Sequence, residues 1–138
     1  MTKLNPIRVA LENHLATIGG APLPAVAWPN VPYARQEGTP YIRAEFLPMT
    51  RRPATTGINP EHRRAGMFLL TVYTPESQGA AAGMLVAERL EERFTAGTED
   101  IVAPTVTVRL EYSEAKPPLH DPPFFAIPVE IGWYAFSR

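Results

Sequence analysis

The sequence predicts an α+β fold in which two helices pack on one face of a mostly antiparallel or mixed four-stranded sheet. The main observation is that a strand pattern passes directly into a helix pattern between Arg63 and Phe94. The segment RRAGMFLLTVYT is rich in β-branched and aromatic residues, and TPESQGAAAGMLVAERLEERF continues it with apolar residues at helical spacing. Along the chain the patterns follow the order α-β-β-α-β-β, without an internal repeat or a domain linker. A chain of 138 residues is therefore expected to form one domain over residues 1–138.

The first helix is expected to begin at Asn5, whose side chain can cap it, and to end at the glycine pair 19–20. Pro6 suits the first turn, because its missing N–H would have no helical partner there. The predicted buried stripe of this helix consists of Ile7, Leu11, Leu15 and Ile18.

The second helix is expected to begin with Thr74 as its N-cap, Pro75 in the first position and Glu76 in the first turn. Gly97 is expected to close it. Its predicted buried stripe consists of Gly83, Val86, Ala87, Leu90 and Phe94.

Four strands are expected, and the segments 41–47, 105–111 and 124–136 supply three of them by alternating apolar and polar positions. Pro128 lies within the last segment and cannot donate to a ladder, so it is expected on a sheet edge or at a bulge. The remaining strand follows a predicted long loop, PMTRRPATTGINPEHRR. One face of this strand is expected to present Phe68, Leu70 and Val72 to the helices, and the other face Met67, Leu69, Thr71 and Tyr73.

Composition excludes several classes of function. The formal net charge of -1 gives no general attraction to nucleic acid or to an anionic membrane. The absence of cysteine excludes disulfides, thiolate metal sites and thiol nucleophiles. No apolar run approaches the roughly 20 residues that span a bilayer, and the N-terminal segment lacks the apolar region of a signal peptide, so cytoplasmic synthesis is expected. Of the 16 prolines, 13 lie in the segments 22–32, 40–60 and 117–128, which also hold aromatic residues, and this indicates rigid loops rather than disorder.

Catalytic motifs are absent from the sequence. The three histidines, His14, His62 and His120, have no partners at metal-ligand spacing, and no serine lies in a Gly-x-Ser-x-Gly turn. Prolines on both sides of the His120–Asp121 doublet favour a turn over a metal site. We therefore expect no enzyme, metal or cofactor. A small enzyme that uses His62, or His120 with Asp121, is the alternative, and it requires these side chains to converge in a pocket.

A candidate assembly interface combines a cationic loop with the outward face of the strand that follows it. Two arginine pairs bracket the loop, and arginine offers a planar fork for the carboxylates or phosphates of a partner. The apolar outward face is either covered by the proline loops or used to bind another protein. The candidate residues are Arg51, Arg52, His62, Arg63, Arg64, Met67, Leu69 and Tyr73. A nucleic-acid-binding module is a further alternative, although Glu45 and Glu61 disfavour it.

Several segments, in this order, resemble the tail terminator (tail completion) proteins of tailed phages and prophages, and related phage domains of unknown function. They are IRVALENHLATIGG, AWPNVPYARQEGTPYIRAEFLP, GMFLLTVYTPESQGAAAGMLVAERLEERF, VTVRLE and FFAIPVEIGWYAF. The resemblance covers nearly the whole chain and implies a sheet flanked by helices. It brings no catalytic residue, because such proteins act through surfaces and loops.

The same resemblance implies a structural, non-enzymatic role in the virion tail, after assembly in the bacterial host cytoplasm. Such proteins form a ring, typically a hexamer, that ends the tail tube and supports head joining. The implied partners are other copies of the chain, the tail tube protein and the head–tail connector protein, with no membrane and no specific nucleic acid ligand. Head-completion and neck connector proteins of similar size share this ring principle and are the nearest alternative.

Overall fold

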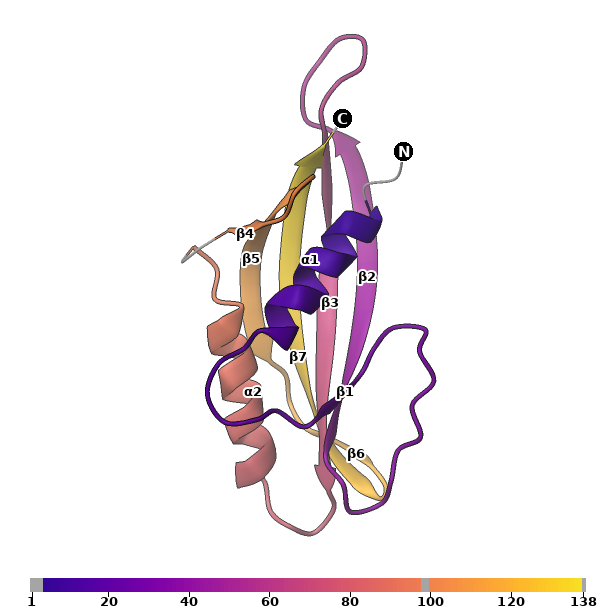
Figure 1. Cartoon of the computed structure of the whole chain (residues 1–138), viewed down its shortest axis with the longest axis vertical. Helices are drawn as coiled ribbons and strands as arrows, with labels where there is room; N and C mark the ends of the chain where they lie inside the picture. Colours follow the sequence, from indigo (N-terminus) through magenta and orange to yellow (C-terminus); the bar gives the residue numbers. More distant parts are fainter. Residues whose placement is uncertain (1–3, 98–99, 138) are drawn as a thin grey trace.

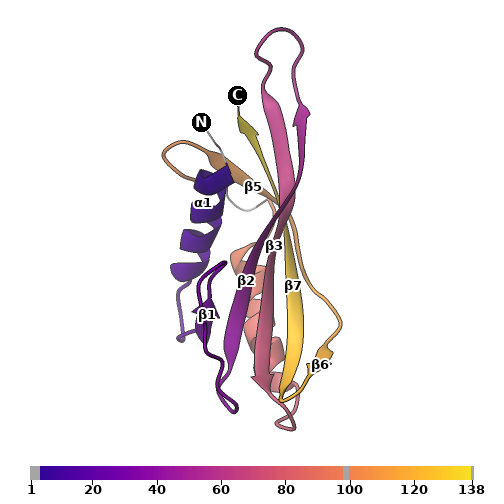
Figure 2. The same cartoon turned by 90° about the vertical axis from the view of Figure 1, so that its right-hand side faces the viewer.

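The structure is a computed structural model that describes residues 4–97 and 100–137. Two helices accompany a strongly extended sheet within these residues, and both helices cover the same face of the sheet (Figures 1 and 2). The elements in chain order are α1 (Leu4–Ala16), β1 (Ala25–Ala27), β2 (Tyr41–Pro53), β3 (His62–Pro75), α2 (Ala81–Arg93), β4 (Ile101–Val102), β5 (Thr107–Ala115), β6 (Leu119–Asp121) and β7 (Phe124–Ser137).

The sheet has seven strands in the order β1-β2-β3-β7-β5-β4, and β6 pairs with the first part of β7. The pair β1–β2 is parallel and the other pairs are antiparallel. The expected four-stranded sheet with the order α-β-β-α-β-β is therefore wrong: the sheet is a curled, mixed, seven-stranded one. The three additional strands are two or three residues long, too short for an alternating pattern to appear in the sequence. They exist because the long strands offer open edges to pair with.

The main core lies between the sheet and the two helices. Ile7, Leu11 and Leu15 of α1 are fully buried, as the apolar stripe predicts, while Ile18 beyond the helix is half-buried. Phe68, Leu70 and Val72 face the helices from β3, again as predicted. Trp133 is the largest fully buried side chain and stacks on Phe46 with ring centroids 5.3 Å apart.

The second helix begins later than the sequence predicts. Thr74 and Pro75 do not start it, because β3 continues through them and pairs them with Phe125 and Phe124 of β7. A turn with positive φ at Ser77 and Gly79 follows, and α2 begins at Ala81. The Thr-Pro-Glu motif is typical of a helix start, but here cross-strand pairing decides the conformation of its first two residues. The predicted start of the helix is therefore wrong.

Pro128 lies in a central strand, contrary to the predicted edge or bulge. Its carbonyl accepts a hydrogen bond from the Lys116 N–H at the point where β5 has ended and β6 has not begun. The Pro128 nitrogen, which has no hydrogen to donate, therefore faces the gap between β5 and β6. The sheet loses no ladder hydrogen bond at this position.

Candidate assembly surface

The four candidate arginines lie on the paired strands of a long hairpin. The predicted loop over 48–64 is wrong, because β2 continues to Pro53 and β3 starts at His62. Arg51 pairs with Arg64 and Arg52 with Arg63. Pairing with β7 supports this strand conformation, since Arg63 lies opposite Phe136. We call residues 50–64 the arginine hairpin, and its end rises beyond both helices (Figures 1 and 2).

Gly66 gives the hairpin its bend. The pairing between β2 and β3 shifts between Pro48 and Thr50, which marks a bulge next to Gly66. A Cβ atom at position 66 would lie 2.4 Å from the Leu47 carbonyl oxygen and 2.8 Å from the Trp133 ring. Only glycine allows β2 and the core tryptophan to approach this closely, so residue 66 positions the whole hairpin.

The tip of the hairpin is an ordered turn that carries an apolar side chain. The Ala54 N–H donates to the Glu61 carbonyl at 2.7 Å, and the Glu61 N–H donates to the Thr55 hydroxyl at 2.8 Å. Gly57 has a φ of 102°, which a turn of this kind requires. Ile58 is fully exposed at the tip. Ile58 is not recognisable from the sequence, because a single isoleucine within a polar segment has no periodic signal.

Three of the four arginines of the hairpin form no ion pair with a described residue. Arg63 lies over the Tyr134 ring at 4.6 Å and 3.7 Å from the Glu111 carboxylate, and Arg51 contacts the His62 ring nitrogen at 3.3 Å. No carboxylate of the described residues forms an ion pair with Arg51, Arg52 or Arg64. The Arg64 Nε atom is buried and makes no hydrogen bond within the described part of the chain. Since like charges opposite each other on paired strands are unfavourable, this arrangement is suited to an external anionic partner.

The predicted outward row divides into two parts. Met67 and Leu69 are half-buried on the face away from the helices, and Leu47, which pairs with Met67, is exposed there. Tyr112 of β5 lies on the same face and packs on Gly132, where an added Cβ would overlap its ring. Burial and the nearby carboxylates of the sheet raise the pKa of the Tyr112 phenol.

Tyr73, in contrast, is covered by the chain itself. It is only 8% exposed and belongs to a second aromatic cluster with Tyr41 and Phe124. The Tyr41 and Tyr73 rings stack at 4.5 Å, and Tyr33 of the connection between β1 and β2 packs on Tyr41 at 5.0 Å. Burial raises the pKa of the Tyr73 phenol. The structure thus brings seven of the eight candidate residues to one half of the hairpin and sheet, and separates Tyr73 from them.

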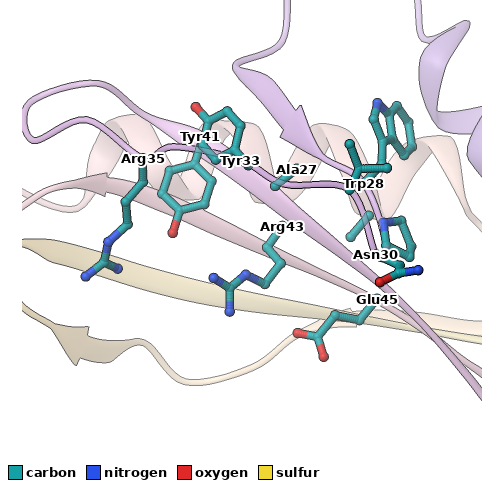
Figure 3. Close-up of a pocket in the computed structure, with 11 residues that line it drawn as sticks. Ala27, Trp28, Asn30, Tyr33, Arg35, Tyr41, Arg43 and Glu45 are labelled. Carbon is teal, nitrogen blue, oxygen red and sulfur yellow. The ribbon is translucent and has the colours of Figure 1, made fainter.

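A pocket of about 270 Å³ lies between residues 27–35 and β2. Figure 3 shows Arg35, Arg43 and Glu45 pointing to the same side of it. Glu45 is the only carboxylate among the lining residues, which include no histidine, serine, threonine or lysine. This lining holds no pair of nucleophile and base.

The two alternative histidine positions of the enzyme hypothesis, His62 and His120, lie at opposite ends of β7. His62 pairs with Ser137 and His120 with Phe125, positions roughly 40 Å apart along β7 at about 3.3 Å per residue. His14 is elsewhere, with its Nε2 atom 2.9 Å from the Arg93 carbonyl oxygen. Within residues 4–97 and 100–137, no group of three or more histidine, aspartate or glutamate residues could hold a metal ion. Neither helix there has the length and hydropathy to cross a membrane.

A curled sheet with helices on one face and a cationic hairpin at one end defines a sheet-based module with a projecting hairpin. The chain belongs to the phage tail terminator family: the model of that family, described as phage tail terminator protein, matches residues 6–133. The chain is therefore a structural component of a phage tail and interacts with other tail or head–tail proteins.

Structural comparison agrees with this fold. A solved structure whose name states no function has a TM-score of 0.77 to this chain at 20% sequence identity. The superposition covers 100% of this chain and 98% of the other. At this identity the likeness concerns the fold alone. No curated protein matches the sequence.

Proposed function

We propose that the chain assembles into a closed ring, a hexamer on the tail tube, that terminates the tube and supports head joining. Its partners are further copies of itself, the tail tube protein and the head–tail connector protein, and assembly takes place in the host cytoplasm. The role needs no catalysis and no cofactor. Family membership supports the terminator role over a head-completion or neck connector protein.

The single observation that carries the proposal is the arginine hairpin. It extends beyond the body of the molecule, it presents three arginines without an ion-pair partner among the described residues, and its tip exposes Ile58. An apolar tip on a cationic stem is suited to a partner surface with an apolar hollow and acidic rim. Because the subunits of a ring meet through two different patches, the hairpin has its complement elsewhere on the ring or on the tube.

The experiment is replacement of Arg51 and Arg52 with glutamate, followed by electron microscopy of the tails. We expect tails of abnormal length that fail to join heads, while the isolated protein keeps its fold and melting temperature. The matched control replaces Arg8 and Arg35, which lie outside the hairpin, with glutamate and should leave tail length normal. Tails of normal length from the Arg51–Arg52 variant would refute the proposal, as would its unfolding.

Nucleic-acid binding through the same arginines is the second candidate, favoured by their exposure. It predicts an affinity for double-stranded DNA that falls steeply with salt, because phosphate contacts release counterions. Our proposal predicts weak binding with little salt dependence. A steep dependence that the Arg51–Arg52 variant abolishes would favour the DNA-binding function instead.

A further inference from the structure

We propose that the arginine hairpin binds the groove between α2 and β5 of a second copy of this chain, with residues 50–53 of β2 lying antiparallel to residues 112–115 of the neighbouring β5. This inference rests on the proposed ring. It identifies the surface of the neighbouring copy that binds the hairpin, which the proposed function does not specify.

The first observation is the open edge of β2. The neighbouring strand β1 pairs only with residues 41–43 of β2. Residues 44–53 have no strand partner on that side among the described residues. An unprotected strand edge of this length is a template for pairing with another chain. It carries Arg51 and Arg52, so whatever adds to this edge also meets the cations of the hairpin.

The second observation is a complementary edge on the far side of the sheet. On β5, β4 pairs only with Thr107 and Val108, which leaves residues 109–115 without an outer strand in the described part of the chain. The Ala115 N–H instead donates to the Glu91 carboxylate at 2.8 Å, and the Ser113 hydroxyl donates to the Glu91 carbonyl at 2.9 Å. An acidic side chain thus takes the place that a neighbouring strand would occupy at the end of this edge.

The third observation is the groove itself. A hollow of about 460 Å³ runs between α2 and β5, with Tyr112 on one wall and Glu88, Glu91 and Glu92 on the other. None of these three glutamates forms an ion pair with a described residue. The groove therefore offers the carboxylates of Glu88 and Glu92, which form no ion pair with a described residue, and the hairpin offers the guanidinium groups of Arg51 and Arg52, which form none either. Each surface supplies what the other lacks.

Strand direction agrees with a ring. From β2 through β3 and β7 to β5, each successive pair is antiparallel, so β2 and β5 run in opposite directions. Two copies in the same orientation, offset along the strands by about six residues or roughly 20 Å, bring residues 50–53 of one β2 next to residues 112–115 of the other β5 as an antiparallel pair. The helices of both copies then remain on the same side of the joined sheet. Such a contact is heterologous and can repeat around a closed ring.

Charge reversal tests the pairing. Arg52→Glu and Glu92→Arg should each reduce ring formation on purified tail tubes by on the order of ten-fold or more, as expected for loss of a close interfacial charge pair. The double variant should recover most of the loss. Glu92 is exposed, so folding should survive, and circular dichroism checks this. Glu88→Arg is the second variant to use if Glu92→Arg does not fold.

Cysteine crosslinking supplies the geometric test, because the chain has no cysteine of its own. Arg52→Cys combined with Glu92→Cys should give a ladder of disulfide-linked oligomers after oxidation on tail tubes. The control that combines Arg52→Cys with Arg35→Cys should give none. Rings that form on tubes without this crosslink, and without rescue by the double charge reversal, would overturn the inference and leave the proposed ring intact. Absence of any ring from the wild-type protein on tubes would refute the proposed function itself.

Discussion

The two halves of the outward sheet face are built on the same strands and differ in what covers them. At the end near the start of β2, Tyr41, Tyr73 and Phe124 form an aromatic cluster over which the chain folds its own connection, with Arg35 over the Phe124 ring at 5.1 Å. At the hairpin end, Met67 is half-buried and pairs with the exposed Leu47, and the hairpin beyond them carries three arginines that form no ion pair with a described residue. Apolar character alone therefore does not identify an assembly surface: the chain covers one half itself, and we propose that a partner covers the other.

The largest expected loss of stability follows a substitution in the aromatic cluster, on the covered half of the sheet face. Phe124 is fully buried, so Phe124→Ala should lower the free energy of unfolding by about 3–5 kcal/mol. Chemical denaturation measures it. Wild-type stability in this variant would show that the aromatic cluster does not hold the connection in place, and the contrast between the two halves would fail.

A substitution at the base of the hairpin should affect stability less and geometry more. Gly66→Ala places a methyl group against the Leu47 carbonyl and the Trp133 ring, at a cost of about 1–3 kcal/mol from overpacking. The hairpin should shift, so tail termination should fall further than the stability loss explains. Gly19→Ala, in open space and, like Gly66, without a positive φ, is the control for an added methyl group that meets no neighbour. Equal assembly by both variants would argue against a positioning role for Gly66.

On the open half, substitutions should separate stability from assembly. Leu69→Ser removes part of the half-buried outward row and should lower stability by about 1 kcal/mol. Assembly should weaken more, because such rows contribute mainly when a partner excludes water from them. Analytical ultracentrifugation in the presence of tail tubes gives the second quantity. If stability falls and assembly does not, Leu69 belongs, like Tyr73, to the part of the sheet face that the chain covers itself.

The smallest expected change in stability is at the tip. Ile58→Ser should leave the free energy of unfolding within about 0.5 kcal/mol of wild type, since the side chain has no cover to lose. Binding to tubes should nevertheless weaken. Val102→Ser, another strongly exposed apolar position outside the hairpin, is the matched control and should bind as wild type does. If both variants bind tubes equally well, the tip is not part of the interface.

Sequence patterns predict those features of the fold that depend on a single helix or a single strand. The stripe of α1 and the inward row of β3 are long periodic signals, and both are buried as expected. What failed depends on distant pairing: the strands of the arginine hairpin need each other and β7, and the turn at Ser77 needs β3 to continue beyond Thr74. The four arginines were found as a charge cluster, while their cross-strand arrangement was not foreseeable. The cover over Tyr73 and the acidic groove beside β5 also arise only in three dimensions.

Hydrogen exchange of the protein, free and bound to tail tubes, compares the two halves most directly. We expect amides of residues 44–64 to gain protection on binding, while exchange at residues 33–41 stays unchanged. New protection confined to residues 33–41, with the hairpin unchanged, would contradict the central claim that the arginine hairpin is the assembly surface.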